Sequence, residues 1–260
     1  MPSNYYVGIS DLEIMNRCEF KRNRVHTQQI IYNSFSQAGL ESDVTTLPGI
    51  AVARVYYLLS PITLGGLFKV NFVEHSENVF IRMQEEYRKL KETLGDFIDF
   101  NITLTFNNIG DVDAVPATKF EDIDTCARLS SIDTIITKRF SIQSETDGLK
   151  GFVFSVAEND PCYNQKTRLE FFQENIIRPL GAEIAMKAGS HSKDMLENDY
   201  PCNRSFEPGS WSYNYEFAFR TLGKRLKGIL LFRFSEGRPS EKGKPGPNAY
   251  VISTFAVLYK

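Results

Sequence analysis

The sequence predicts a mainly β fold with inserted α-helices: a β-sandwich of jelly-roll type with a projecting N-terminal helix. Many short segments combine β-branched and aromatic residues and are bounded by Gly, Pro or Asn, as strands are. The segment FIDFNITLTF, residues 97–106, alternates apolar and polar residues like a half-buried strand. Helix signals are confined to three stretches. We therefore expect a helical arm at residues 1–39 and a single sandwich domain at residues 40–260.

The first stretch predicts a long N-terminal helix. Residues 10–13, SDLE, have the pattern of a capping box, and Gly39 is expected to end the helix. Its apolar stripe is narrow, while Arg17, Lys21 and Arg24 share one face. A projecting helix whose partners lie on another chain fits this pattern. A solvated helix with ordinary surface charge fits it equally well.

The next elements are predicted as two strands, a helix, a strand and a loop. Strands at 50–59 and 67–73 are joined by a turn containing Pro61 and two glycines. Ser76 is expected to cap a core-packed helix that runs to about Leu94. The strand at 97–106 follows, and the acidic run 111–124 is predicted to be a solvated loop.

The second half is predicted as strands around one helix. Strands are expected at 132–142 and 151–157, and a helix at 166–187 with a kink at Pro179. Residues 188–211 are predicted to form a loop. The chain then closes with strands at 213–222, 226–234 and 248–259, and residues 235–246 form a charged loop between the last two.

Composition and motifs favour a protein without catalytic activity. The chain is 42% hydrophobic and 24% charged, with a net charge of -2, so any basic patch is local. No P-loop, GxGxxG, GxSxG or HExxH motif occurs. The three histidines lack metal-ligand spacing, and the four cysteines, without a CxxC pair, are expected to be free thiols. We therefore expect no enzymatic activity, no metal and no required cofactor.

The order of features resembles the cypovirus (cytoplasmic polyhedrosis virus) polyhedrins. The segments ARVYYLL, FKV, YRKLKE and TIITKRFSI follow the N-terminal stretch in a similar order and spacing. The residues of that stretch and of the C-terminal region that carry the resemblance are Asn16, Arg17, Phe20, Arg22, Arg24, Tyr32, Asn33, Ser36, Gly39 and Pro247-Asn248-Ala249-Tyr250.

The resemblance implies a structural protein of viral occlusion bodies with a capsid-like β-sandwich. Such a protein forms homotrimers that assemble into crystals and embed virus particles in the cytoplasm of the infected insect cell. The crystals protect the virus outside the host and dissolve at alkaline gut pH. The resemblance also implies structurally bound nucleotides, with Arg22 and Arg24 as candidate phosphate contacts. No membrane and no specific nucleic acid are expected. The candidate intermolecular contacts of the arm are Arg17, Phe20, Lys21, Arg22, Arg24 and Tyr32.

Alkaline dissolution is compatible with the composition. Tyr and Lys side chains titrate near 10 and 10.4, and the chain has 12 Tyr, so its negative charge grows steeply above these values. The candidate titrating residues are Tyr56, Tyr57, Tyr213, Tyr215 and Tyr250.

Two other classes of function remain open. A viral capsid, matrix or RNA-binding shell protein of related β-fold would bind RNA through the basic residues of the arm in a salt-sensitive way. A cytosolic enzyme with a dispersed site would bring together two of His26, His75, His191 and Cys162 in one pocket.

Overall fold

A computed structural model describes ten parts of the chain. They are residues 28, 30–47, 69–94, 102–125, 129–158, 170–188, 211–212, 215–221, 225–239 and 245–260. The chain divides into two compact units, Met1–Phe154 and Ser155–Lys260. No helix in these ten parts is both long and apolar enough to span a membrane.

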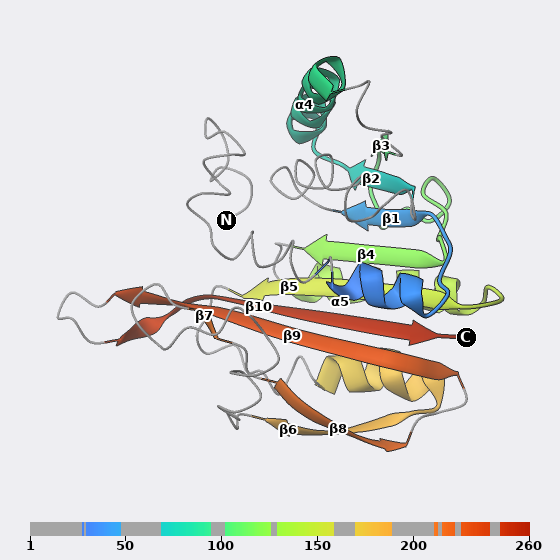
Figure 1. The fold of residues 1–260 in the computed structure, drawn as a ribbon, viewed down its shortest axis with the longest axis vertical. Coiled ribbons are helices and arrows are strands. Elements are labelled where there is room, and N and C mark those ends of the chain that lie inside the picture. The colour runs from blue at the N-terminus through green and yellow to red at the C-terminus, as the bar shows by residue number, and fades with distance from the viewer. Residues whose placement is uncertain are drawn as a thin grey trace. The chain divides into compact units, whose positions relative to one another are not determined.

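The first unit is built on parallel strands (Figure 1). These strands are β1 (Val44–Leu47), β2 (Val70–Glu74), β3 (Ile102–Phe106), β4 (Phe120–Thr125) and β5 (Lys150–Glu158), which continues into the second unit. Their order is β3-β2-β1-β4-β5. β1 is parallel to both β2 and β4, and β2 is parallel to β3. This order, in which β1 lies between β2 and β4, is that of a doubly wound α/β sheet.

The predicted jelly-roll sandwich is therefore wrong, because sandwiches of that type are antiparallel while these strands are parallel. Two element predictions failed with it. The acidic run 111–124 contains β4, and the segment predicted as a strand at 132–142 belongs to helix α5 (Leu129–Ser144). The strands predicted near 67–73 and 151–157 are confirmed as β2 and β5. In the segment 97–106, the described strand is β3, at its C-terminal half.

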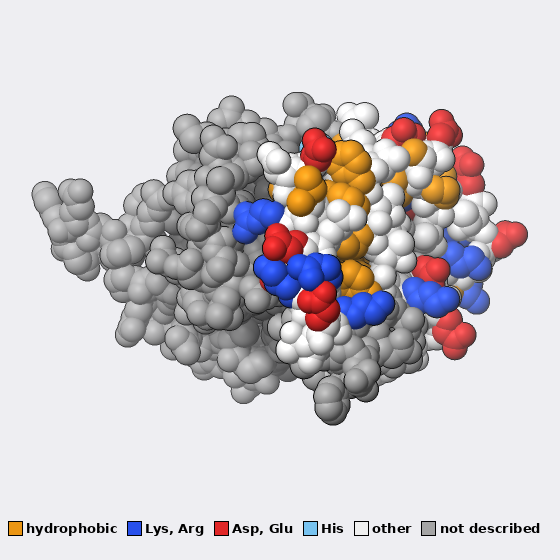
Figure 2. All heavy atoms as spheres, turned by 90° about the horizontal axis from the view of Figure 1, so that it is seen from above, with side chains coloured by type: hydrophobic (Ala, Val, Ile, Leu, Met, Phe, Trp, Pro, Cys, Tyr) orange, Lys and Arg blue, Asp and Glu red, His pale blue; other side chains and the backbone are white. Residues whose placement is uncertain are grey.

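Helix α4 (Glu77–Leu94) confirms the predicted helix that follows Ser76. The backbone N–H of Phe80 donates to the carbonyl of Ser76. Met83, on the apolar side of the helix, is buried. Its outer side carries ion pairs one turn apart, such as Arg88 with Glu92. Figure 2 shows this face of the molecule, where acidic and basic side chains lie beside a strip of apolar ones. Charged side chains of alternating sign keep the surface of the helix hydrated, and exposed ion pairs between them contribute little to stability.

Residues 30–37 are helical but do not form a projecting arm. The helix ends at Gly39, as predicted, and this glycine has a φ of 88°. Tyr32 and Phe35 are buried and pack their rings against Phe120 of β4. The prediction of Tyr32 as an intermolecular contact is therefore wrong, because its aromatic ring belongs to the core of its own unit. The rest of the predicted arm lies outside the described residues.

The helix at residues 30–37 and α5 contact opposite faces of the parallel sheet. Glu121 and Asp122 are consecutive residues of β4, so their side chains point to opposite faces. Glu121 binds Arg139 of α5, and Asp122 accepts a hydrogen bond from Tyr32. The central strands are thus covered on both sides, as parallel sheets require.

The second unit contains mainly antiparallel strands. β9 (Leu226–Pro239) pairs along its length with β10 (Pro245–Tyr259), and β7 (Trp211–Ser212) pairs with β9. β6 (Glu183–Ala188) pairs with β8 (Tyr215–Thr221) in a second sheet. The strands predicted at 213–222, 226–234 and 248–259 are confirmed as β8, β9 and β10, and the last two are longer than expected.

The predicted helix at 166–187 is shorter in the structure. Residues 170–172 are helical, η1 (Gln173–Ile177) is a π-helix and η2 (Arg178–Leu180) is a 3-10 turn. Gly181, with a φ of 70°, ends the helix, and β6 begins two residues later. Phe172 packs its ring against Phe255 of β10 in the core of this unit.

Candidate functional site

The carboxyl ends of β1, β2 and β4 form the candidate site. The chain proceeds from β1 outward to β2 and β3, and then returns to the other side of β1 to form β4 and β5. In open α/β sheets, ligands bind outside the carboxyl ends of the strands where the order reverses. The last residues of the three strands at this point are Leu47, Glu74 and Thr125.

Glu74 ends β2 and is the one carboxylate among these last residues. Its side chain is 9% exposed, and its Oε1 accepts a hydrogen bond from the backbone N–H of Ser76 at 2.7 Å. The backbone N–H of Asn107, just after β3, donates to the carbonyl of Glu74. The first bond holds the carboxylate, and the second holds the backbone of Glu74. Its Oε2 has no hydrogen-bond partner in the described part of the chain, so it can accept a bond from a ligand.

His75 is the exposed neighbour of this carboxylate. Its Nδ1 lies 3.4 Å from Oε1 of Glu74, and its side chain is 69% exposed. No group of three or more His, Cys, Asp or Glu side chains that could hold a metal occurs among the residues described. The dispersed pocket of histidines and Cys162 cannot be traced, because His26, His191 and Cys162 lie outside those residues.

The sequence after β1 restricts the kind of ligand. The sequence that follows Leu47 is Pro48-Gly49-Ile50-Ala51, with a single glycine. In dinucleotide-binding folds, three glycines at this turn let the backbone and the next helix approach the pyrophosphate. The sequence lacks that pattern, while Glu74 stands at the end of β2, and dinucleotide-binding folds bind ribose hydroxyls through an acidic residue that follows the glycines. The residues thus fit a nucleoside better than a dinucleotide.

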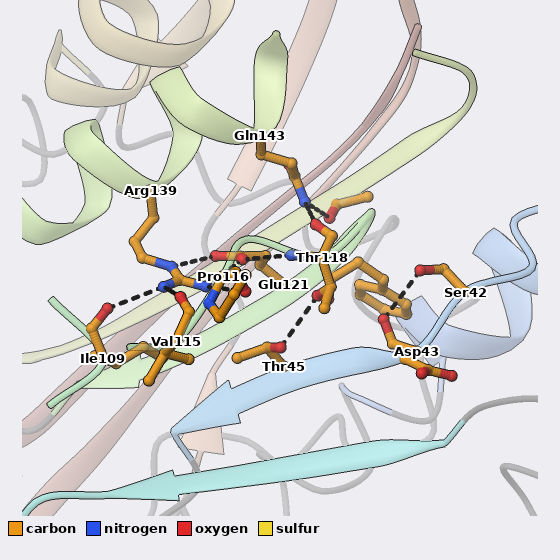
Figure 3. Close-up of polar contacts among 12 residues, drawn as sticks. Ser42, Asp43, Thr45, Ile109, Val115, Pro116, Thr118, Glu121, Arg139 and Gln143 are labelled. Atoms are coloured by element: carbon orange, nitrogen blue, oxygen red, sulfur yellow. Dashed lines mark hydrogen bonds and ion pairs between the residues drawn. The ribbon is translucent and has the colours of Figure 1, made fainter. Parts of the chain in front are cut away.

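A buried ion pair fixes the other face of the sheet (Figure 3). Arg139 of α5 is fully buried and binds both carboxylate oxygens of Glu121. Its Nη1 also donates to the carbonyls of Ile109 and Val115, so the guanidinium ties down the connection between β3 and β4. Burial raises the pKa of Glu121, while the hydrogen bonds and the charge of Arg139 act in the opposite direction. Because neither side chain is exposed, we assign the pair a structural role.

Among the predicted intermolecular contacts, Tyr32 is the one that the structure describes. Tyr32 lies in the core, and the side chains of Tyr215 in β8 and Tyr250 in β10 are not described. Sequence reasoning missed Glu74. The signal was present, since an apolar strand ends there on an acidic residue two positions before a helix cap. The predicted residues that lie outside the described ones are Arg17, Phe20, Lys21, Arg22, Arg24, Tyr56, Tyr57 and Tyr213.

Comparison with known proteins gives similarity only to solved structures. No family model and no curated protein matches the sequence. The N-methyltransferase NodS from Bradyrhizobium japonicum WM9 is 10% identical over 92% of this chain and 97% of its own, with a TM-score of 0.44. A SAM-dependent methyltransferase from Agrobacterium tumefaciens is 11% identical over 90% of this chain and 61% of its own, with a TM-score of 0.47. Precorrin-6y C5,15-methyltransferase from Geobacter metallireducens GS-15 is 10% identical over 88% and 85%, with a TM-score of 0.41.

The resemblance to polyhedrins is wrong, because the parallel sheet is not a capsid-like sandwich. The occlusion-body function and the shell-protein alternative depended on that fold and are corrected with it. The expected lack of enzymatic activity is corrected as well, because that expectation favoured an assembly protein, whereas the sheet is of the doubly wound class, whose switch point binds ligands. NodS was also solved in complex with S-adenosyl-l-homocysteine. The homotrimer, the virus-particle partners and the cytoplasmic location stay predictions.

Proposed function

We propose that this chain binds S-adenosylmethionine at the carboxyl ends of β1 and β2 and acts as a methyltransferase. The observation that carries the proposal is Glu74, a fixed and nearly buried carboxylate at the end of β2 with one oxygen available to a ligand. It lies on the strand next to β1, where the strand order reverses.

Glu74 is suited to hold the ribose of the cofactor. The two ribose hydroxyls are hydrogen-bond donors, and an ionised carboxylate is a strong acceptor. A hydrogen bond to a charged group contributes about 1.5–3 kcal/mol. S-adenosylmethionine has no phosphate, so the single glycine after β1 is no obstacle to its binding. The cofactor, when bound, supplies an activated methyl group on a sulfonium. The role of Glu74 is to bind and orient the nucleoside.

The first test is the affinity for S-adenosylhomocysteine, measured by isothermal titration calorimetry. The substitution Glu74→Gln keeps an oxygen for the N–H of Ser76 but replaces the acceptor toward the ribose with an amide N–H₂. We expect it to weaken binding about 10- to 100-fold. Glu77→Gln is the matched control, because Glu77 is an exposed glutamate in the first turn of α4. The Glu77→Gln variant should bind S-adenosylhomocysteine with the affinity of the wild-type protein.

A second measurement separates binding from catalysis. The wild-type protein should form S-adenosylhomocysteine from S-adenosylmethionine when a methyl acceptor is supplied, and NADH should not compete. Absence of S-adenosylhomocysteine binding, or unchanged binding after Glu74→Gln, would refute the proposed site. Binding without turnover across a broad panel of acceptors would leave a nucleoside-binding protein and overturn the enzymatic part.

A further inference from the structure

A second group of polar side chains lies buried on the opposite face of the same strands from the Glu121–Arg139 pair. Gln28 and Tyr32, which lie one turn apart before β1, both point at Asp122 of β4. The Nε2 of Gln28 and the hydroxyl of Tyr32 donate to Oδ2 of Asp122 at 2.6 and 2.7 Å. Thr46 of β1 is the neighbour of Asp122 in the parallel pairing. All four side chains are 2% exposed or less.

Within the described part of the chain, two atoms of this group are buried without a hydrogen-bond partner: Oε1 of Gln28 and Oγ1 of Thr46. Buried polar atoms are nearly always paired, because an unpaired one destabilises the folded state. The orientation of Gln28 is fixed, because its N–H₂ must face the carboxylate of Asp122. Its oxygen therefore points away from Asp122. The free protein retains two acceptors that another molecule can use.

The strand register places these acceptors at the proposed site. Thr46 and Asp122 are paired residues of parallel strands about 4.8 Å apart, so their side chains share one face. Thr46 is the second-last residue of β1, the strand at which the order reverses. Thr46 thus lies near the carboxyl end of β1, beside the switch point at which ligands bind in such sheets, and Gln28 is linked to it through Asp122.

The chemistry of the group selects the kind of ligand atom. An amide oxygen can only accept hydrogen bonds, and the hydroxyl of Thr46 can accept as well as donate. The carboxylate of Asp122 lies one hydrogen bond away from Gln28 and adds negative potential. Carboxylates and phosphates are therefore excluded, and a positively charged group with several N–H donors is favoured. A primary ammonium group has both properties.

We infer that Gln28 and Thr46 receive the ammonium group of the amino acid part of S-adenosylmethionine. The inference rests on the proposed function, in which Glu74 binds the ribose of the same ligand. Gln28 and Thr46 supply oxygen acceptors, and Asp122 holds the amide of Gln28 in the orientation that presents its oxygen.

The test compares two nucleosides that differ in the amino acid part. S-adenosylhomocysteine carries the ammonium group, and 5′-methylthioadenosine lacks the whole amino acid. Thr46→Val is nearly isosteric and removes an oxygen that makes no bond in the free protein. We expect it to weaken binding of S-adenosylhomocysteine about 3- to 10-fold and to leave that of 5′-methylthioadenosine unchanged. The midpoint of unfolding should stay the same or rise, because an unpaired buried hydroxyl has been removed.

Two further variants complete the experiment. Thr45→Val is the matched control, since the hydroxyl of Thr45 accepts from Thr118 on the other face of the sheet. It should leave the affinities for both nucleosides unchanged. Gln28→Met removes the second acceptor while keeping the length of the side chain. It should again weaken binding of S-adenosylhomocysteine selectively, even if its stability falls through the lost bond to Asp122.

The outcomes separate the inference from the proposed function. If the wild-type protein binds neither nucleoside, both are overturned. If both nucleosides bind and the Thr46 and Gln28 substitutions weaken them equally or not at all, the ammonium site is refuted and the nucleoside site stands. Unchanged affinities are expected if a buried water molecule donates hydrogen bonds to the two oxygens. Selective loss of S-adenosylhomocysteine binding in both variants supports the inference.

Discussion

Arg139 shows how one side chain can determine the local structure of a loop. It is among the largest fully buried side chains described, and its guanidinium binds Glu121 and the carbonyls of Ile109, Val115 and Pro116. A buried charge is tolerated only when it is paired and hydrogen-bonded in this way. The connection between β3 and β4, which has no helix, obtains its fixed shape from these bonds.

Replacing Arg139 with Met should strongly destabilise the protein. The substitution leaves the carboxylate of Glu121 buried without its partner, which typically costs about 3–5 kcal/mol. Urea denaturation gives the change in the free energy of unfolding. Lys138→Met is the control, because the ammonium of Lys138 makes one exposed bond, to the carbonyl of Gly110. This control should change stability by less than about 0.5 kcal/mol. A similar effect of both substitutions would show that the buried pair is unimportant.

Tyr87 on α4 should make stability sensitive to alkaline pH. Burial raises the pKa of its hydroxyl above the ordinary value, so the folded state disfavours the ionised form. The corresponding stability is complete below about pH 10 and is lost as the pH rises through the raised pKa. In Tyr87→Phe, the free energy of unfolding should fall less between pH 9 and 11 than in the wild-type protein. Parallel pH profiles for the two proteins would contradict this assignment.

Gly151 allows close packing between β5 and the helix at residues 30–37. A Cβ atom at this position would lie 2.8 Å from side-chain carbons of both Phe35 and Leu40. Such overpacking costs about 1–3 kcal/mol, so Gly151→Ala should lower the free energy of unfolding by that amount. Gly228→Ala in β9 is the control, since its Cβ would meet its nearest atom at an ordinary 3.9 Å. Equal stability of the two variants would mean that residues 35 and 40 do not pack against β5.

Elements with a strong local pattern could be predicted from the sequence, and their arrangement could not. The apolar stripe of α4 and the positions of β9 and β10 follow from residue spacing. Helix α5 was mistaken for a strand, because TIITKRFSI is rich in β-branched residues and the packing of Arg139 outweighs that preference. β4 was mistaken for a loop, because its acidic residues are paired with groups far away in the sequence.

Some residues of the candidate site could likewise be predicted from the sequence, and others could not. Glu74 could have been predicted, since the local sequence shows an acidic residue between an apolar strand and a helix cap. Gln28 and Thr46 could not, because they reach one place only through the parallel register of β1 with β4. The same alternation of residues is compatible with parallel and antiparallel neighbours. The resemblance to polyhedrins failed for this reason, since it relied on the order of segments and not on their pairing.

For the whole molecule, the proposed ligand is a source of stability located in one unit. Glu74, Gln28 and Thr46 all belong to the first unit. A ligand that binds only the folded state stabilises it by mass action, by about 2.7 kcal/mol at 100 times the dissociation constant. Trp211, the single tryptophan, belongs to the second unit, so its fluorescence reports on that unit.

Addition of S-adenosylhomocysteine at 100 times its dissociation constant should therefore raise the melting temperature of the first unit by about 5–10 °C. Circular dichroism follows the helices, and Trp211 fluorescence follows the second unit in the same samples. Glu74→Gln at the same ligand concentration should show a clearly smaller shift, while Glu77→Gln should match the wild-type protein. If the two probes shift together, binding to the first unit stabilises the whole chain; if only circular dichroism shifts, the units unfold separately. No shift by either probe at saturating ligand would rule out binding to the folded protein.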